Sequence, residues 1–171
     1  VDGAKYRLSV SAVDSAGNEA EPVIVNDVMF DVTLPLITVS SPTEGAFLQS
    51  TSLTYELSET CEFGKAVWTW SGGTEDPAEI HTQLMAESEL LAGEHDGNLG
   101  NKVELIDGAI YRLEINVQDL AGNEGELVIM GNLYYDATPP VLAITAPSKD
   151  EIVNYTTVSY SLSEELQSAV I

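Results

Sequence analysis

The sequence predicts an all-β chain in which antiparallel β-sandwich modules repeat about every 105 residues. Short segments alternate apolar and polar side chains, which is typical of strands with one buried face. Glycine, proline and asparagine separate these segments at short intervals. Residues 119–124 (DLAGNE) repeat residues 14–19 (DSAGNE) at an offset of 119 − 14 = 105. Other identical pairs at this offset are Tyr6 and Tyr111, Asp31 and Asp136, Pro35 and Pro140, Pro42 and Pro147, and Tyr55 and Tyr160.

The repeat divides the chain into one complete module, residues 35–138, and parts of two others. Residues 1–34 would hold the last strands of a preceding module, and residues 139–171 the first strands of a following one. Two strands alone are at best marginally stable in water, so the first part needs partner strands. The first linker contains Pro35, which favours an extended and stiff chain. The second linker has one proline more and is expected to be stiffer.

Within the complete module, apolar–polar alternation predicts seven strands. Their expected positions are residues 36–40, 52–58, 66–70, 80–85, 103–106, 111–117 and 126–135, with one or two helical turns at 86–92. Trp68 and Trp70 are two residues apart and share one face of the third strand, and a tryptophan packed there is a feature of immunoglobulin-type cores. Gly131 in the last strand is a candidate for a bulge. We therefore expect an immunoglobulin-like antiparallel β-sandwich.

The charge of the chain is far from balanced. Its 171 residues include 28 acidic and 6 basic ones, for a net charge of −22. Such a surface repels nucleic acid and anionic lipid, so neither is an expected partner. It serves solubility, or it attracts hard cations such as Ca²⁺. Cys61 is the single cysteine, so an intramolecular disulfide is impossible, and no stretch of about 18 apolar residues indicates membrane insertion.

Several motifs resemble the bacterial Ig-like repeats of large secreted and surface-anchored adhesins. These motifs are residues 53–59 (LTYELSE), 68–73 (WTWSGG), 107–113 (DGAIYRL), 119–124 (DLAGNE) and 136–141 (DATPPV). The resemblance covers essentially the whole chain. It implies a string of sandwich domains that extends an adhesive tip from the bacterial cell surface, with Ca²⁺ at the junctions and neighbouring modules as partners.

Sandwich topology also predicts where acidic side chains gather. Strands run alternately up and down, so the loops after the second, fourth and sixth strands meet at one end of the module, where the linker also enters. The side chains expected there are Asp31, Glu59, Asp119, Asn123 and Glu124, with Glu62 close by. Crowded carboxylates repel one another unless they are bridged, and Ca²⁺ takes 6–8 oxygen ligands. The expected half-sites of the neighbouring junctions are Asp14 and Asn18, and Asp136 and Glu164 with Glu165.

The alternative at this loop is a turn with no metal. Gly122 can supply a positive φ, and aspartate and asparagine form hydrogen bonds within such loops. Both interpretations stay open from the residues alone.

For function, the sequence predicts a structural spacer or adhesion segment stiffened by calcium. One alternative is a self-assembling extracellular filament or sheath, in which neighbouring copies complete the partial modules. A second is a carbohydrate-binding module that uses Trp70. An enzyme is not expected, because His81 and His95 lack a zinc-ligating cysteine partner and Cys61 lacks a paired histidine.

Overall fold

The computed structural model describes residues 1–164 and confirms the prediction of an all-β chain. The chain divides into two compact units, Val1–Asp136 and Ala137–Ile171. The helical turn expected at 86–92 is a single 3₁₀ turn, Glu87–Glu89. Over the described residues, no helix has the length and apolar character that crossing a lipid bilayer requires.

The larger sheet of the first unit has five strands in the order β4, β10, β9, β6, β7. The strands are β4 (Phe47–Leu48), β6 (Cys61–Gly73), β7 (Ile80–Leu84), β9 (Ala109–Asp119) and β10 (Val128–Tyr135). All neighbours are antiparallel except β4, which runs parallel to β10. The pairing of β10 with β9 is irregular between Met130 and Leu133, and Asn132 has φ 53°. The bulge expected at Gly131 therefore lies where the sequence predicts it.

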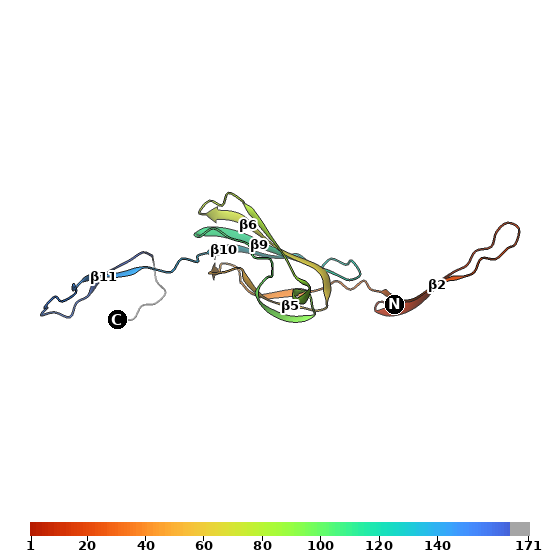
Figure 1. Cartoon of the computed structure of the whole chain (residues 1–171), viewed down its shortest axis with the longest axis horizontal. Coiled ribbons are helices and arrows are strands. Elements are labelled where there is room, and N and C mark those ends of the chain that lie inside the picture. Colours follow the sequence, from red (N-terminus) through yellow and green to blue (C-terminus); the bar gives the residue numbers. More distant parts are fainter. Residues whose placement is uncertain (165–171) are drawn as a thin grey trace. The chain divides into compact units, whose positions relative to one another are not determined.

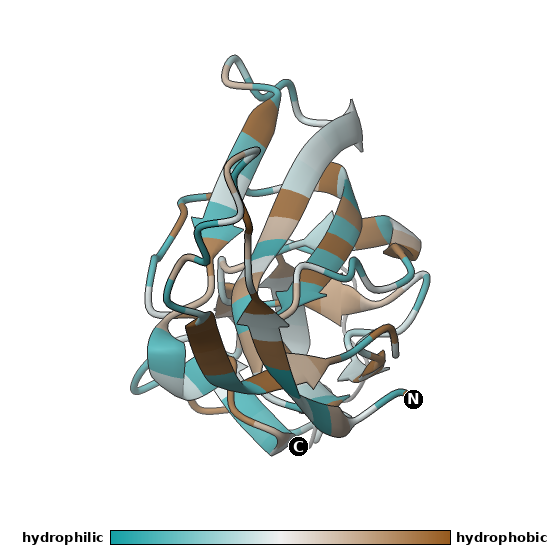
Figure 2. Ribbon diagram, turned by 90° about the vertical axis from the view of Figure 1, so that its right-hand side faces the viewer, coloured by the Kyte–Doolittle hydropathy of each residue, from teal (hydrophilic) through white to brown (hydrophobic). Residues whose placement is uncertain are grey.

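A second sheet has three antiparallel strands in the order β3 (Ile37–Ser41), β5 (Ser52–Leu57), β8 (Gly93–Asn98). Figure 1 shows β5 in one layer and β6, β9 and β10 in the other. Hydrophilic and hydrophobic residues alternate along the strands (Figure 2), as a sheet with one buried face requires. The architecture is that of two packed β-layers.

The core lies between the layers. Trp68 of β6 and Tyr111 and Leu113 of β9 are fully buried, in the same hydrophobic cluster as Leu53 of β5 and Leu133 of β10. Leu53, Tyr111 and Leu113 are among the side chains that the alternation predicts to point inward. Burying one large apolar side chain stabilises a fold by roughly 1.5–3 kcal/mol, so this cluster supplies most of the driving force for the layers to pack.

One expected strand is in the wrong place. Residues 103–106 are irregular, and the strand that pairs with β5 is β8, Gly93–Asn98. Leu105 is buried, so the alternation around it reflects an apolar anchor without a hydrogen-bonded ladder. The sequence of β8 (GEHDGN) has no apolar alternation. Its strand character comes from main-chain pairing with β5, which side-chain patterns do not reveal.

Two hairpins flank this sandwich in the sequence. The first joins β1 (Ala4–Val10) to β2 (Val23–Phe30), and the second joins β11 (Leu142–Ala146) to β12 (Ser159–Leu162). Leu8, which occupies in β1 the position of buried Leu113 in β9, is 54 % exposed. The candidate residue Glu165 lies outside the described residues.

Candidate functional site

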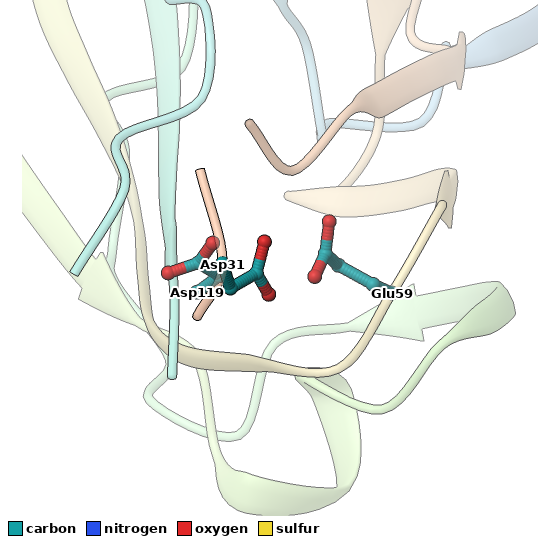
Figure 3. A group of neighbouring side chains, drawn as sticks. All are labelled: Asp31, Glu59 and Asp119. Atoms are coloured by element: carbon teal, nitrogen blue, oxygen red, sulfur yellow. The ribbon is translucent and has the colours of Figure 1, made fainter. Parts of the chain in front are cut away.

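Three carboxylates converge where the linker enters the sandwich. Asp31 belongs to the linker, Glu59 to the turn between β5 and β6, and Asp119 to the end of β9. One carboxylate oxygen from each lies within 4.8 Å of the others, and in Figure 3 the three groups face a common space. Asp31 and Glu59 are half-buried, whereas Asp119 is 1 % exposed. Among residues 1–164, this is the one group of three or more potential metal-ligating side chains that meets this criterion.

Asp119 is held rigidly by the loop that follows it. Its Oδ1 accepts hydrogen bonds from the main-chain N–H groups of Ala121 and Asn123, both at 2.8 Å, and its Oδ2 accepts one from Nδ2 of Asn123, also at 2.8 Å. Gly122 supplies the positive φ of 91° that the turn needs. Burial raises the pKa of the Asp119 carboxyl, but the donors from Asn123 and the loop outweigh it and hold the pKa below its usual range. Asp119 is therefore a preoriented anion.

Glu59 experiences the opposite balance. Burial, followed by repulsion from Asp31 and Asp119, raises the pKa of its carboxyl, and Asp2 adds a smaller repulsion. Three negative charges at this spacing destabilise one another when all are ionised. A bound cation would reverse the sign of that interaction.

The linker itself is tied down on both sides. The carbonyl oxygen of Asp31 accepts a hydrogen bond of 3.2 Å from Nδ2 of Asn123, and one of its carboxylate oxygens accepts the N–H of Thr33 at 3.0 Å. Asp2 accepts the N–H of Val32 at 2.7 Å and the hydroxyl of Thr33 at 2.5 Å. Sequence reasoning missed Asp2. The Asp2-Gly3 pair recurs 105 residues later as Asp107-Gly108, and that repetition could have identified it.

The remaining predicted ligands behave differently from one another. Asn123 uses its side-chain nitrogen to hold both Asp119 and the linker, so it acts as a donor that shapes the site. Glu124 is exposed and lies outside the acidic group, although its main chain bridges to Gln118. Glu62 is exposed as well.

The half-site on the first hairpin reproduces the Asp119 loop. Oδ1 of Asp14 accepts the N–H groups of Ala16 and Asn18, both at 2.8 Å, and its Oδ2 accepts Nδ2 of Asn18 at 2.7 Å. Hydrogen bonds from Asn18 hold the pKa of Asp14 below its usual value.

The other half-site consists of Asp136, the last residue of the first unit, and Glu164, which belongs to the second unit. The main-chain N–H of Asp136 donates to the carbonyl oxygen of Leu48 at 2.8 Å, and Glu164 is exposed.

A second polar cluster lies inside the sandwich. Asp76 is 2 % exposed, and its Oδ2 accepts the hydroxyl of Tyr111 and contacts Nε2 of His81, both at 2.6 Å. The indole nitrogen of buried Trp68 donates to Oε1 of Gln83 at 2.7 Å. No sequence motif indicated these contacts, and Asp76 and Tyr111 are 35 residues apart. Trp70, the candidate for sugar stacking, is half-buried and donates to the carbonyl oxygen of Thr74.

The chemistry of the acidic group fits a hard divalent cation. Carboxylate oxygens are ligands that Ca²⁺ prefers, and each of the three carboxylates offers one of the 6–8 oxygens it takes, with main-chain carbonyls and water as further ligands. Comparison with models of known protein families finds no match to the chain, and comparison with curated proteins finds none either.

Proposed function

We propose that the chain is a segment of tandem immunoglobulin-like modules that serves as a spacer in a bacterial extracellular surface protein, with Ca²⁺ stiffening its junctions. The observation that carries this proposal is the convergence of linker and loop carboxylates, Asp31, Glu59 and Asp119, within 4.8 Å of one another. The resemblance of the repeated motifs to adhesin repeats supports the extracellular location.

Strand pairing supports the tandem arrangement. In β1–β2 the partners are Leu8 with Val25, and in β9–β10 they are Leu113 with Met130, each number larger by 113 − 8 = 130 − 25 = 105. The pairing of β11 with β12 likewise repeats that of β3 with β5, including the position of the irregularity. Sheets ordered β4-β10-β9-β6-β7 and β3-β5-β8, with Trp68 buried on β6, favour an immunoglobulin-like topology.

The proposed mechanism is electrostatic. Without a cation, the three carboxylates repel one another, and this repulsion adds to burial in raising the pKa of Glu59. A cation between them converts repulsion into attraction and joins the linker to the sandwich. A rod of such joints holds a distal domain away from its anchor, whereas a cation-free chain behaves as a flexible string.

Calcium titration of the chain, followed by thermal unfolding and small-angle X-ray scattering, tests the proposal. Ca²⁺ at about one hundred times its dissociation constant should stabilise the fold by about 2.7 kcal/mol. A chelator should lower the melting temperature and shorten the maximum dimension in solution. The variant Glu59→Gln keeps the size of the side chain and removes one of the three charges, so Ca²⁺ should stabilise it less than it stabilises the unaltered chain. If neither quantity changes with Ca²⁺ in the unaltered chain at physiological salt, the cation has no part in the function.

A second function, a subunit of an extracellular filament or sheath, is favoured by one observation. The apolar side chains of the hairpin β1–β2 are exposed, Leu8 and Val10 among them, although the equivalent residues of β9 are buried. Strands from a neighbouring copy could cover them by strand addition. Mass spectrometry of the native protein distinguishes the two functions, because a mature chain much longer than 171 residues excludes the filament subunit.

A further inference from the structure

The linker meets the sandwich through a main-chain contact that leaves no space for a side chain. Pro35 is fully buried, and its carbonyl oxygen lies so close to Gly125 that a Cβ atom added to Gly125 would be 2.6 Å from it. The same Cβ would be 3.1 Å from Cγ2 of Val117. Nonbonded heavy atoms are most stable roughly 3.5–4.0 Å apart. Gly125 does not adopt the left-handed φ found at Gly122, so space requires the glycine at this position.

Neither side of this contact can move without breaking hydrogen bonds. The N–H of Gly125 donates to the carbonyl oxygen of Val117 at 2.9 Å, which anchors it to a central strand of the larger sheet. On the linker side, the N–H of Leu36 donates to Oγ of Ser58 at 2.9 Å, and the carbonyl oxygen of Leu36 accepts the N–H of Ser58 at 3.0 Å. The contact is therefore a fixed point of the linker, which we call the Pro35 seat.

Asp31 lies four residues before the seat. Its carbonyl oxygen is held by Asn123, which belongs to the same loop that ends at Gly125. The loop thus contacts the linker at two points, through a hydrogen bond at Asp31 and through close backbone packing at Pro35. A linker displaced at Pro35 would carry Asp31 away from Glu59 and Asp119.

We infer that Gly125 is the positioning residue that places Asp31 in the acidic group, and that the residue at this position determines whether a junction closes. The part that concerns cation binding rests on the proposed function. The equivalent position of the first hairpin carries Ala20, since 125 − 105 = 20, even though its Asp14 loop has the same hydrogen bonds as the Asp119 loop. A linker that approached that loop in the same way would meet a Cβ. At a junction with glycine at this position, the linker contacts the loop and the junction is stiff. At a junction with alanine, the contact is not made and the junction is flexible.

Isothermal calorimetry with Ca²⁺ alone tests the inference on the full chain. Gly125→Ala should raise the dissociation constant by about tenfold or more, as loss of a supporting contact around a metal site commonly does. Gly100→Ala is the matched control, because its added Cβ would lie 3.6 Å from the nearest atom, an ordinary contact. The dissociation constant of Gly100→Ala for Ca²⁺ should equal that of the unaltered chain. Equal affinity in Gly125→Ala and the unaltered chain would overturn the positioning role.

Amide hydrogen exchange in chelator separates the seat from the cation. Gly125→Ala should speed exchange of the Leu36 N–H by at least about tenfold, while the N–H of Leu113 in the core keeps its rate and shows that the sandwich is folded. If the unaltered chain binds no Ca²⁺ but this change occurs, the proposed joint fails and the seat stands. An unchanged rate at Leu36 overturns the seat whatever calcium does. Should Gly125→Ala not fold, Pro35→Ala keeps the carbonyl oxygen but removes the buried ring that holds the linker at the seat. This variant must produce the same faster exchange, or the inference is wrong.

Discussion

Replacing Tyr111 by phenylalanine tests how strongly the buried polar cluster supports the sandwich. The hydroxyl of Tyr111 donates to Oδ2 of Asp76 at 2.6 Å and accepts the N–H of Ile106 at 2.9 Å. Tyr111 is fully buried and Asp76 nearly so, so water cannot replace the lost partner without rearrangement. Phenylalanine keeps the ring and its packing, and the variant therefore isolates the two hydrogen bonds.

The expected loss follows from what each bond joins. A hydrogen bond to a charged group contributes about 1.5–3 kcal/mol, and leaving the Ile106 N–H unpartnered costs about 1 kcal/mol more. Tyr111→Phe should therefore lower the free energy of unfolding by about 3 kcal/mol. Tyr55→Phe is the matched control, since the hydroxyl of Tyr55 makes one bond of 2.7 Å to the neutral carbonyl of Glu89. Its expected cost is about 1 kcal/mol.

Urea unfolding at neutral pH, followed by tryptophan fluorescence, measures both variants, and an unchanged slope shows that the change is one of stability. The reasoning is refuted if Tyr111→Phe loses no more free energy of unfolding than Tyr55→Phe does.

The pH dependence of stability gives a second check. Burial raises the pKa of Asp76, but hydrogen bonds from Tyr111 and His81 outweigh it and lower the pKa. The stability from this carboxylate is present above its ordinary pKa and is lost as pH falls through the lower folded value. The difference in free energy of unfolding between Tyr111→Phe and the unaltered chain should therefore become smaller over that acidic range.

Two further predictions follow from the repeat and the acidic group. Without metal, Glu59→Gln should raise the melting temperature at neutral pH, because burial and repulsion raise the pKa of Glu59 in the folded chain. For a group shifted in that direction, the stabilising contribution is present at pH below the unfolded pKa and is lost as pH rises through the folded one, so the variant should lack this loss. With Ca²⁺ bound, Glu59→Gln should instead melt at a lower temperature than the unaltered chain. Thermal scans with and without chelator measure both differences in melting temperature. If the variant raises the melting temperature in neither condition, the repulsion is contradicted. Leu113→Ala should destabilise the sandwich by about 3–5 kcal/mol, because Leu113 is fully buried. Leu8→Ala, at the equivalent position of the exposed hairpin, should change the unfolding midpoint little, and equal losses in denaturant titrations would show that the hairpin is buried in solution.

Side-chain periodicity was enough to predict most of the fold. The inward positions of β5 and β9 follow from alternation alone, because a half-buried strand must place apolar side chains on one face. The loop after β9 was also predictable, since aspartate, glycine and asparagine at this spacing form a hydrogen-bonded turn. Topology then predicted the meeting of Asp31 with Asp119, because entering chain and loop share one end of a sandwich.

Other features have no periodic signature and arise only when distant segments pack. Strand β8 depends on main-chain hydrogen bonds to β5, which many different side chains can accompany. The contact of Asp76 with Tyr111 joins residues that are 35 positions apart in the sequence. Asp2 reaches the linker across about thirty residues of sequence. The Pro35 seat depends on the absence of a Cβ at Gly125. Whether a Cβ fits there depends on how closely the two backbone segments approach, which only the tertiary structure shows. Local chemistry accounts for the strands and turns, and close packing selects which polar groups and which glycine control the junction.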